Sequence, residues 1–206
     1  MASPLAHALV GAAVYAVMAP RGAPLRRVLP WALAALAGAA ADLDFVPGIL
    51  VGDPSRYHHW ATHSLAAALV FASVVGPLAP ARLGTLGQRT AILGVAYASH
   101  LGLDLLTIDH TLPQGIPLFW PISTAVFLAP VTPFWDLYHG RGWAAFVNWH
   151  NAIAVLIEAV VVGVPVVALC VFRLRREGRT TVGARRGFAK DSIGDLGGRG
   201  RREAGG

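Results

Sequence analysis

Apolar residues of this chain gather in five long runs separated by polar connections. In lipid, backbone N–H and C=O groups must be satisfied within their own segment, as they are in a helix. We therefore predict helices over residues 5–19, 28–51, 61–81, 90–106 and 149–172. From Ala152 to Phe172 the last run has one charge, Glu158, and it meets the ~20 residues that a span needs. The pattern predicts an all-α, polytopic transmembrane bundle of about five helices.

Composition supports a membrane domain followed by a tail. The chain has 206 residues, of which 55% are hydrophobic and 14% charged, and this is too apolar for an ordinary soluble domain. After residue 172 the sequence turns to Arg, Gly and small polar residues, which cannot bury a core. We predict a membrane-embedded domain over 1–172 and a disordered cytoplasmic tail over 173–206. The basic residues at the start of the tail favour binding to anionic lipid. Nucleic-acid binding is disfavoured, because Phe188 is the only aromatic residue in the tail.

Arginine placement predicts the orientation. Arginines lie in alternate connections, which face the cytoplasm by the positive-inside rule. They are Arg21, Arg26, Arg27, Arg82, Arg89, Arg173, Arg175 and Arg176. This places the N-terminus and segments 52–60 and 107–148 outside, and the C-terminus in the cytoplasm. The first apolar run is short and has no preceding basic residue, so we expect a retained, tilted or partial helix rather than a signal peptide.

Most ionisable residues within the apolar runs lie toward one end, and Glu158 in the last run is the exception. Placing an ionisable side chain in hydrocarbon costs about 2.5–3.5 kcal/mol even on the lenient insertion scale, so each such residue needs a compensating partner. With the orientation above, these residues all fall toward the outer face. They are His7, Asp42, Asp44, His63, His100 and Asp104. The topology argument did not use them, so their convergence independently indicates a site.

Two pairs within this set have informative spacing. His100 and Asp104 are four residues apart, which places both on one helical face, as two ligands of one metal require. Asp42 and Asp44 are two apart and would point about 200° away from each other on a regular helix. The Pro47-Gly48 pair that follows suggests that the helix ends or unwinds there, letting both turn inward. Carboxylates this close favour a metal ion or a shared proton.

A third group is His58, His59 and His63, which precede the third apolar run. Either Thr62 or Ser64 could cap the helix that follows. With a single cysteine in the chain, a multi-cysteine zinc site is excluded, and any metal would need His and carboxylate ligands. Two other readings stay open. Intramembrane carboxylates and histidines also build small transporters and ion or proton pathways, and a metal can merely staple helices together.

In their order, these motifs resemble the YdjM-like family of membrane-bound metal-dependent hydrolases. The family pattern is an early His, Asp-x-Asp, His-Arg-Gly-x-Thr-His-Ser, Ser-His-x-x-x-Asp and Gly-x-Pro-Leu-x-Trp-Pro. The chain has His7, Asp42-Leu43-Asp44, His58-His59-Trp60-Ala61-Thr62-His63-Ser64, Ser99-His100-Leu101-Gly102-Leu103-Asp104 and Gly115-Ile116-Pro117-Leu118-Phe119-Trp120-Pro121. The resemblance covers about residues 4–125 and implies a hydrolase of the bacterial cytoplasmic (inner) membrane. The chain departs from it at His59-Trp60, where the family has Arg-Gly.

A more distant resemblance is to the all-helical zinc phospholipase C and P1 nuclease group. It implies that His63, His100, Asp104 and either Asp42 or Asp44 hold one zinc, with His7 and Asp104 reaching a neighbouring metal. His58 joins them as a further candidate ligand. A third metal would need a His-x-x-x-Glu that is absent, since Ala154 stands four after His150. The expected cofactor is therefore one or two divalent ions, with zinc foremost.

Together the resemblances imply metal-assisted hydrolysis. The expected substrate is a phosphoester or a lipid-borne molecule, cleaved by a metal-activated water. Asp42 or Asp44 would orient that water or accept its proton, and the residues alone do not distinguish the two.

Overall fold

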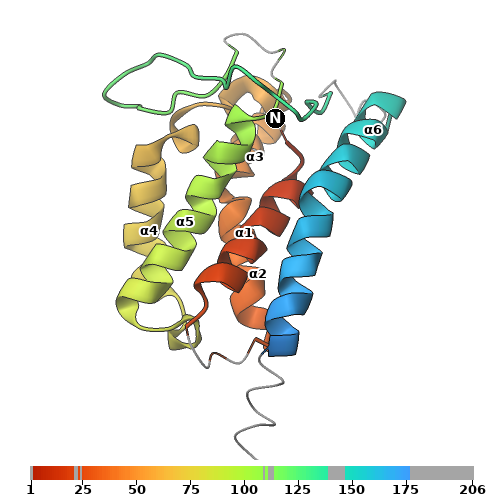
Figure 1. The fold of residues 1–206 in the computed structure, drawn as a ribbon. Helices are drawn as coiled ribbons and strands as arrows, with labels where there is room; N and C mark the ends of the chain where they lie inside the picture. Colours follow the sequence, from red (N-terminus) through yellow and green to blue (C-terminus); the bar gives the residue numbers. More distant parts are fainter. Residues whose placement is uncertain are drawn as a thin grey trace, which may run out of the picture. The chain divides into compact units, whose positions relative to one another are not determined.

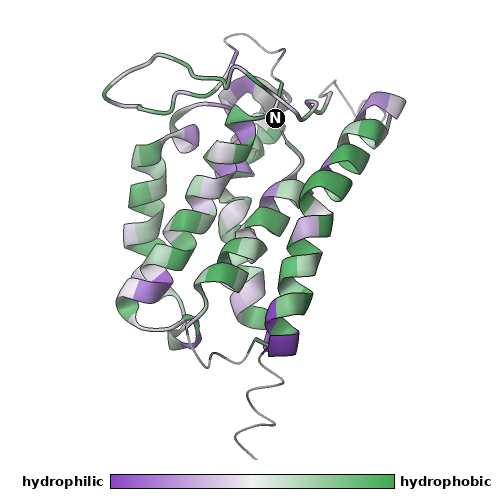
Figure 2. Cartoon of the chain, in the orientation of Figure 1, coloured by the Kyte–Doolittle hydropathy of each residue, from purple (hydrophilic) through white to green (hydrophobic). Residues whose placement is uncertain are grey.

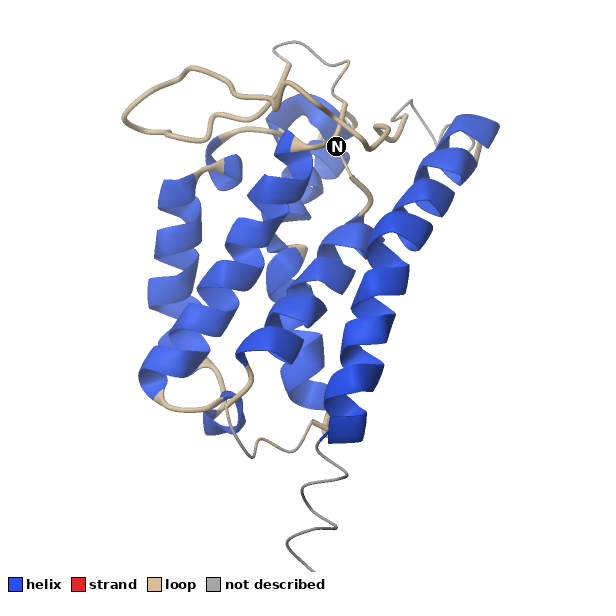
Figure 3. Ribbon diagram, viewed as in Figure 1, coloured by secondary structure: helices blue, strands red, loops and turns tan. Residues whose placement is uncertain are grey.

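The computed structural model describes residues 2–20, 23, 25–108, 110, 114–138 and 147–176, and this part is helical (Figure 3). It contains no strand in the described ranges, where only isolated bridges join Thr107 to Phe134 and Ile116 to Phe127. The α-helices are α1 (Pro4–Met18), α2 (Val28–Gly38), α3 (Phe45–Leu50), α4 (Leu65–Leu78), α5 (Leu86–Leu105) and α6 (Trp149–Glu158). The all-α prediction is confirmed for this part of the chain. Residues 173–176, predicted as the start of the disordered tail, instead belong to the last helix, and the rest of the predicted tail lies outside the described residues from 177 onward.

The chain divides into two compact units, Met1–Cys170 and Val171–Gly206. In the first unit, α1 packs against α2 and α5, and α4 packs along α5 (Figure 1). After α6, a π-helical turn over Ala159–Gly163 leads into a further helical stretch. Helix α1 begins at the end of the bundle where α5 finishes, so the start of one helix and the end of the other can share a site.

Capping residues fix where the helices begin. Ser64 Oγ accepts a hydrogen bond from Ala67 N at 3.1 Å, and this cap starts α4 at Leu65 rather than at residue 61. The preceding residues Ala61–His63 form a 3₁₀ turn. Thr62, the other candidate cap, instead donates to Asp44 at 2.7 Å. The tight turn thus turns His63 inward, where it is fully buried.

The second apolar run breaks earlier than predicted. Helix α2 ends at Gly38, a 3₁₀ helix follows over Ala40–Asp44, and the two halves of the run meet at 58°. The expected break at Pro47-Gly48 is wrong, because both lie in α3, where proline in the first turn sacrifices no helical hydrogen bond. A 3₁₀ helix has about 3.0 residues per turn, so side chains two residues apart are separated by about 120° around the helix axis. In an α-helix the same separation is about 200°, which equals about 160° measured the shorter way. Asp42 and Asp44 can therefore reach one site from adjacent sides.

Two glycines let α1 and α2 cross closely. A Cβ added at Gly11 would lie 2.3 Å from the Ala34 carbonyl oxygen, and one at Gly38 would lie 2.5 Å from the His7 carbonyl oxygen. Small residues at such crossings allow backbones to approach each other. The contact sets the position of His7 relative to the end of α2.

Among the described residues, one helix, Trp149–Arg176, is long and apolar enough to cross a membrane. The bent pair Val28–Gly38 and Ala40–Leu50 passes the same test as a unit, while Pro4–Met18 and Leu65–Leu78 are apolar but shorter. Hydrophobic residues run along most of α1, α4 and α6 (Figure 2). The described α-helices overlap all five apolar runs, but the second run forms two of them, so the count of five helices is not confirmed. The predicted number of spans stays a prediction.

Candidate metal centre

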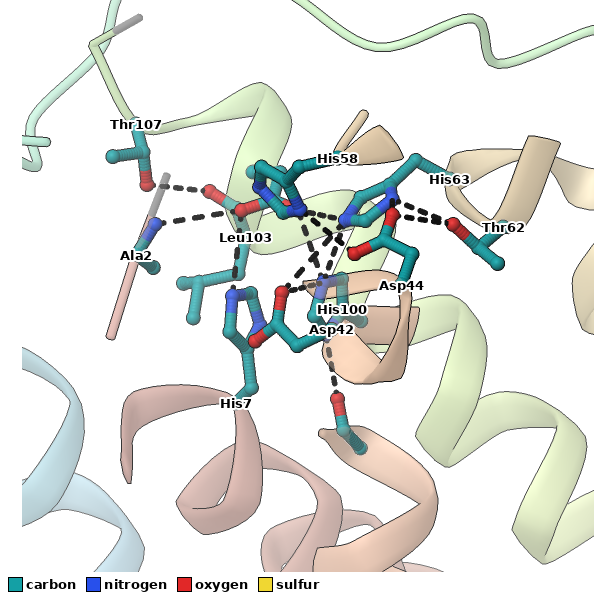
Figure 4. A network of polar contacts seen from close by, with 12 residues as sticks. Ala2, His7, Asp42, Asp44, His58, Thr62, His63, His100, Leu103 and Thr107 are labelled. Atoms are coloured by element: carbon teal, nitrogen blue, oxygen red, sulfur yellow. Dashed lines mark hydrogen bonds and ion pairs between the residues drawn. The ribbon is translucent and has the colours of Figure 1, made fainter. Parts of the chain in front are cut away.

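Histidine and aspartate side chains converge where α1 begins and α5 ends (Figure 4). The 3₁₀ helix after α2 brings Asp42 and Asp44, and the 3₁₀ turn before α4 brings His63. His7, His63, His100 and Asp104 are each less than 5% exposed. The structure thus brings together all seven predicted site residues: His7, Asp42, Asp44, His58, His63, His100 and Asp104.

His100 is oriented by the end of α2. Its Nδ1 lies 2.8 Å from the Gly38 carbonyl oxygen. A carbonyl only accepts, so Nδ1 carries the proton, and in the neutral imidazole Nε2 presents a lone pair. That lone pair faces Asp104 Oδ2 at 3.1 Å, and the pairing confirms the shared face predicted from their four-residue spacing.

His63 is oriented in the same way by a carboxylate. Its Nδ1 lies 3.2 Å from Asp44 Oδ2 and 3.1 Å from Thr62 Oγ1, which itself donates to Asp44. Because Thr62 donates its hydrogen to Asp44, His63 Nδ1 is the donor toward Thr62, and in the neutral ring Nε2 is also left as a lone pair. A carboxylate bound to the far nitrogen of an imidazole is the usual outer partner of a metal-bound histidine.

With both imidazoles neutral, four electron-pair donors therefore face one another. His63 Nε2 and His100 Nε2 are 3.2 Å apart. Asp104 Oδ2 lies 3.4 Å from His63 Nε2, while Asp42 Oδ1 lies 3.5 Å from His100 Nε2 and 3.9 Å from His63 Nε2. Neither Asp42 oxygen has a hydrogen-bond partner within the described ranges, although both are buried. Such a set is repulsive unless a positive charge occupies its centre.

These separations fit a divalent metal ion. In a tetrahedral zinc site with ligands at about 2.0–2.1 Å, neighbouring ligand atoms lie about 3.3 Å apart. Five of the six ligand-to-ligand separations here are 3.1, 3.2, 3.4, 3.5 and 3.9 Å. His63, His100 and Asp104 form one of the groups whose ligand atoms all lie close enough for a shared ion. Two imidazoles and two carboxylates are also a ligand set that zinc accepts.

The second oxygen of Asp104 faces a different partner. Asp104 Oδ1 lies 3.3 Å from His7 Nε2 and accepts the Ala2 N–H at 3.4 Å. The His7 ring stacks on His100, with ring centroids 3.6 Å apart and planes 14° apart. His7, Asp42 and His100 form another group with metal-ligand spacing. One carboxylate thus links two adjacent candidate cation positions.

His58 lies beside this cluster on the loop before α4. Its Nδ1 lies 2.9 Å from Asp44 Oδ1, and its ring stacks on Phe45 with centroids 3.9 Å apart. Burial lowers the pKa of His58 to about 4, so the ring is neutral at pH 7. His58, His59 and His63 form the third group with ligand spacing, and His59 has a left-handed φ of 58°.

A further histidine–aspartate contact was not predicted. His110 Nδ1 lies 3.0 Å from Asp136 Oδ2, and His150 Nε2 lies 3.5 Å from Asp136 Oδ1. No partner of His150 can be predicted from its spacing, because Asp136 is 14 residues away in the sequence. None of these three residues belongs to a group with metal-ligand spacing in the part of the chain described.

Comparison with known families identifies the chain. The family model described as YdjM inner membrane protein matches residues 1–176. Comparisons with curated proteins and with solved structures gave no match, so the distant resemblance to the zinc phospholipase C and P1 nuclease group stays an expectation. The chain belongs to the YdjM inner membrane protein family.

Proposed function

Because the chain belongs to this inner membrane family, we propose that it is a membrane-bound metal-dependent hydrolase acting on a phosphoester or another lipid-borne substrate. The observation that carries the proposal is the convergence of four atoms that can each ligate a metal ion. They are His63 Nε2, His100 Nε2, Asp104 Oδ2 and Asp42 Oδ1. A purely structural polar cluster would pair donors with acceptors, whereas this one gathers acceptors around a common point.

One or two divalent ions, with zinc preferred, would occupy the site. The first would be held by the four atoms just named. A second would lie on the other side of Asp104, whose Oδ1 faces His7. There the second oxygen of Asp42 supplies a further donor without a hydrogen-bond partner inside the described segments.

The two aspartates of the Asp-x-Asp motif have different surroundings, which support different roles. Asp44 is occupied by His58, Thr62 and His63, so we assign it to orienting imidazoles. Asp42 has a carboxylate oxygen to spare, and we assign it both ligation and the acceptance of a proton from the attacking water. A bound divalent ion supplies a water acidified toward a pKa of about 7 and stabilises charge on the oxygens of the scissile group.

The proposed topology has five membrane-crossing segments, with the N-terminus and the metal centre at the outer face. Apolar side chains that no other helix covers support this arrangement. On α4, Leu69 is 70% exposed and Leu78 is 79% exposed. Leu156 on α6 and Val160 in the π-helical turn that follows it are both more than half exposed. Exposure of this kind on successive helices suits contact with acyl chains.

A lipid-borne substrate is favoured by the surface next to the site. Helix α3 directly follows Asp44, and Ile49 and Leu50 on it are 60% and 81% exposed. Trp60, on the loop that carries His58, is 67% exposed. An apolar rim beside a polar centre suits a molecule whose scissile group is polar and whose remainder is apolar.

An activity assay tests the proposal. The full-length chain in detergent or nanodiscs would be given chromogenic phosphomonoesters and phosphodiesters, phospholipid substrates and amides, with and without chelator. We expect hydrolysis of a phosphoester that chelator abolishes, that zinc or manganese restores, and that folded His100→Ala lacks. Activity that persists in His100→Ala, or that needs no metal, would sink the proposal.

A further inference from the structure

Glu158 is a buried carboxylate on an otherwise apolar helix. It is 2% exposed and lies within Trp149–Arg176, the helix best suited to cross a membrane. An acidic residue there costs several kcal/mol unless its surroundings compensate. Its Oε1 accepts the Ser3 N–H at 2.8 Å, while Oε2 has no hydrogen-bond partner among described residues. The contact that it makes therefore needs an explanation.

Ser3 connects Glu158 to the metal centre. As the N-cap of α1, its Oγ accepts the Ala6 N–H at 3.2 Å, and its carbonyl oxygen accepts the His7 N–H at 3.2 Å. Its neighbour Ala2 is fully buried and donates its N–H to Asp104 Oδ1 at 3.4 Å. Glu158 thus holds the short segment that both donates to Asp104 and begins the helix carrying His7.

Electrostatics favour this placement. The N-terminus of α1 carries unsatisfied N–H groups and the positive end of the helix dipole, both of which attract a carboxylate. The first turn of α1 has no acidic residue of its own. Glu158, 155 residues away in sequence, supplies that negative charge from α6.

We infer that Glu158 is a positioning residue of the metal centre, acting through Ser3 on the Asp104–His7 pair. The inference rests on the proposed function, since it needs a centre to position. Residues that hold metal ligands in place by hydrogen bonds typically change the metal affinity by about 10–100-fold when they are substituted. Loss of the Glu158–Ser3 contact frees the segment before α1, so Asp104 loses the Ala2 donor and His7 loses its fixed position over His100.

Zinc affinity and the cobalt spectrum of Glu158 variants test this role. Full-length wild type, Glu158→Gln and Glu158→Leu would carry a C-terminal tag, be stripped by chelator, and be titrated with zinc and cobalt. We expect Glu158→Leu to bind zinc about 10–100-fold more weakly, with an altered cobalt absorption spectrum. Glu158→Gln retains an acceptor for the Ser3 N–H, so its zinc affinity should stay within about threefold of wild type. Leu156→Ala is the matched control, because Leu156 lies two residues from Glu158 and its side chain is exposed. Its zinc affinity and cobalt spectrum should equal those of wild type.

Hydrogen exchange of the metal-free protein gives a readout independent of metal. Amides of residues 2–8 should exchange faster in Glu158→Leu than in Glu158→Gln or Leu156→Ala. A Glu158→Leu variant with wild-type affinity, cobalt spectrum and exchange would overturn the inference, as would lowered thermal stability with unchanged affinity. If wild type itself binds neither zinc nor cobalt, the proposed function and this inference both fall; if wild type binds and Glu158→Leu matches it, this inference falls alone.

Discussion

The Nε2 atoms of His63 and His100 lie 3.2 Å apart, while the opposite nitrogen of each ring faces its own acceptor. His100 Nδ1 donates to the Gly38 carbonyl, and His63 Nδ1 lies 3.1 Å from Thr62 Oγ1 and 3.2 Å from Asp44 Oδ2. Two imidazole lone pairs in a buried site repel each other, and the nearby oxygens of Asp42 and Asp104 increase the negative potential. A bound cation turns all four contacts into favourable ones.

Substitutions in the Asp-x-Asp motif should separate the roles of its two carboxylates. Asp42→Ala removes a proposed ligand, so zinc binding should fall below detection. Asp44→Asn keeps the shape but weakens the orientation of His58 and His63, so affinity should fall by about 10–100-fold without being lost. Isothermal titration with zinc, on variants checked for folding by circular dichroism, measures both. Equal losses in the two variants would contradict the division of roles.

Gly38→Ala should disrupt the bundle and the centre together. The added Cβ would meet backbone at 2.5 Å from the His7 carbonyl oxygen and 2.9 Å from Gly11 Cα, so the helices must move apart. Overpacking of this kind lowers the free energy of unfolding by about 1–3 kcal/mol. The shift also displaces the carbonyl that orients His100, so metal affinity should fall as well.

Gly102→Ala is the matched control for that variant. Gly102 lies on α5 between His100 and Asp104, and a Cβ there meets nothing within 4 Å. Replacing a mid-helix glycine by alanine should raise the free energy of unfolding by up to about 1 kcal/mol. Thermal unfolding in detergent compares the two variants. A Gly38→Ala protein as stable as Gly102→Ala would refute the close helix crossing.

Metal removal should destabilise the folded chain. A ligand that binds only the folded state adds about 2.7 kcal/mol to the free energy of unfolding at 100 times its Kd. Chelator should therefore lower the unfolding temperature of wild type, and zinc in excess should restore it. The same treatments should leave His63→Ala unchanged. An equal chelator effect on both proteins would show that the metal stabilises some other site.

The sequence predicted the members of the site better than their roles. Four-residue spacing on one helix was enough to pair His100 with Asp104, because helical geometry alone sets that contact. The sequence alone could not distinguish the roles of Asp42 and Asp44. Their roles differ because His58 and Thr62 contact Asp44, and these two residues are 14 and 18 positions from it in the sequence. The break at Ala39 has no proline to mark it, and Pro47 lies within α3 rather than at a break. The partners of Glu158 and His150 likewise depend on tertiary packing.

Cysteine labelling should establish the predicted topology. In a Cys170→Ala background, single cysteines would replace Asp53 and Arg82, which are exposed residues in the connections before and after α4. A membrane-impermeant maleimide should label Asp53→Cys in intact spheroplasts. Arg82→Cys should react only after permeabilisation. Labelling of both from outside would refute the multi-pass arrangement with a cytoplasmic loop after α4.

The central claim is that a divalent metal ion occupies the site between His63 and His100, and elemental analysis tests it most directly. Wild type, His63→Ala and His100→Ala would be purified in detergent without chelator, checked for folding, and analysed before and after incubation with zinc or manganese. We predict one or two metal equivalents in wild type and their loss in both folded variants. A wild type that holds no metal, and takes up none when it is supplied, would contradict the claim and leave a proton shared by these imidazoles and carboxylates, as in an ion or proton pathway.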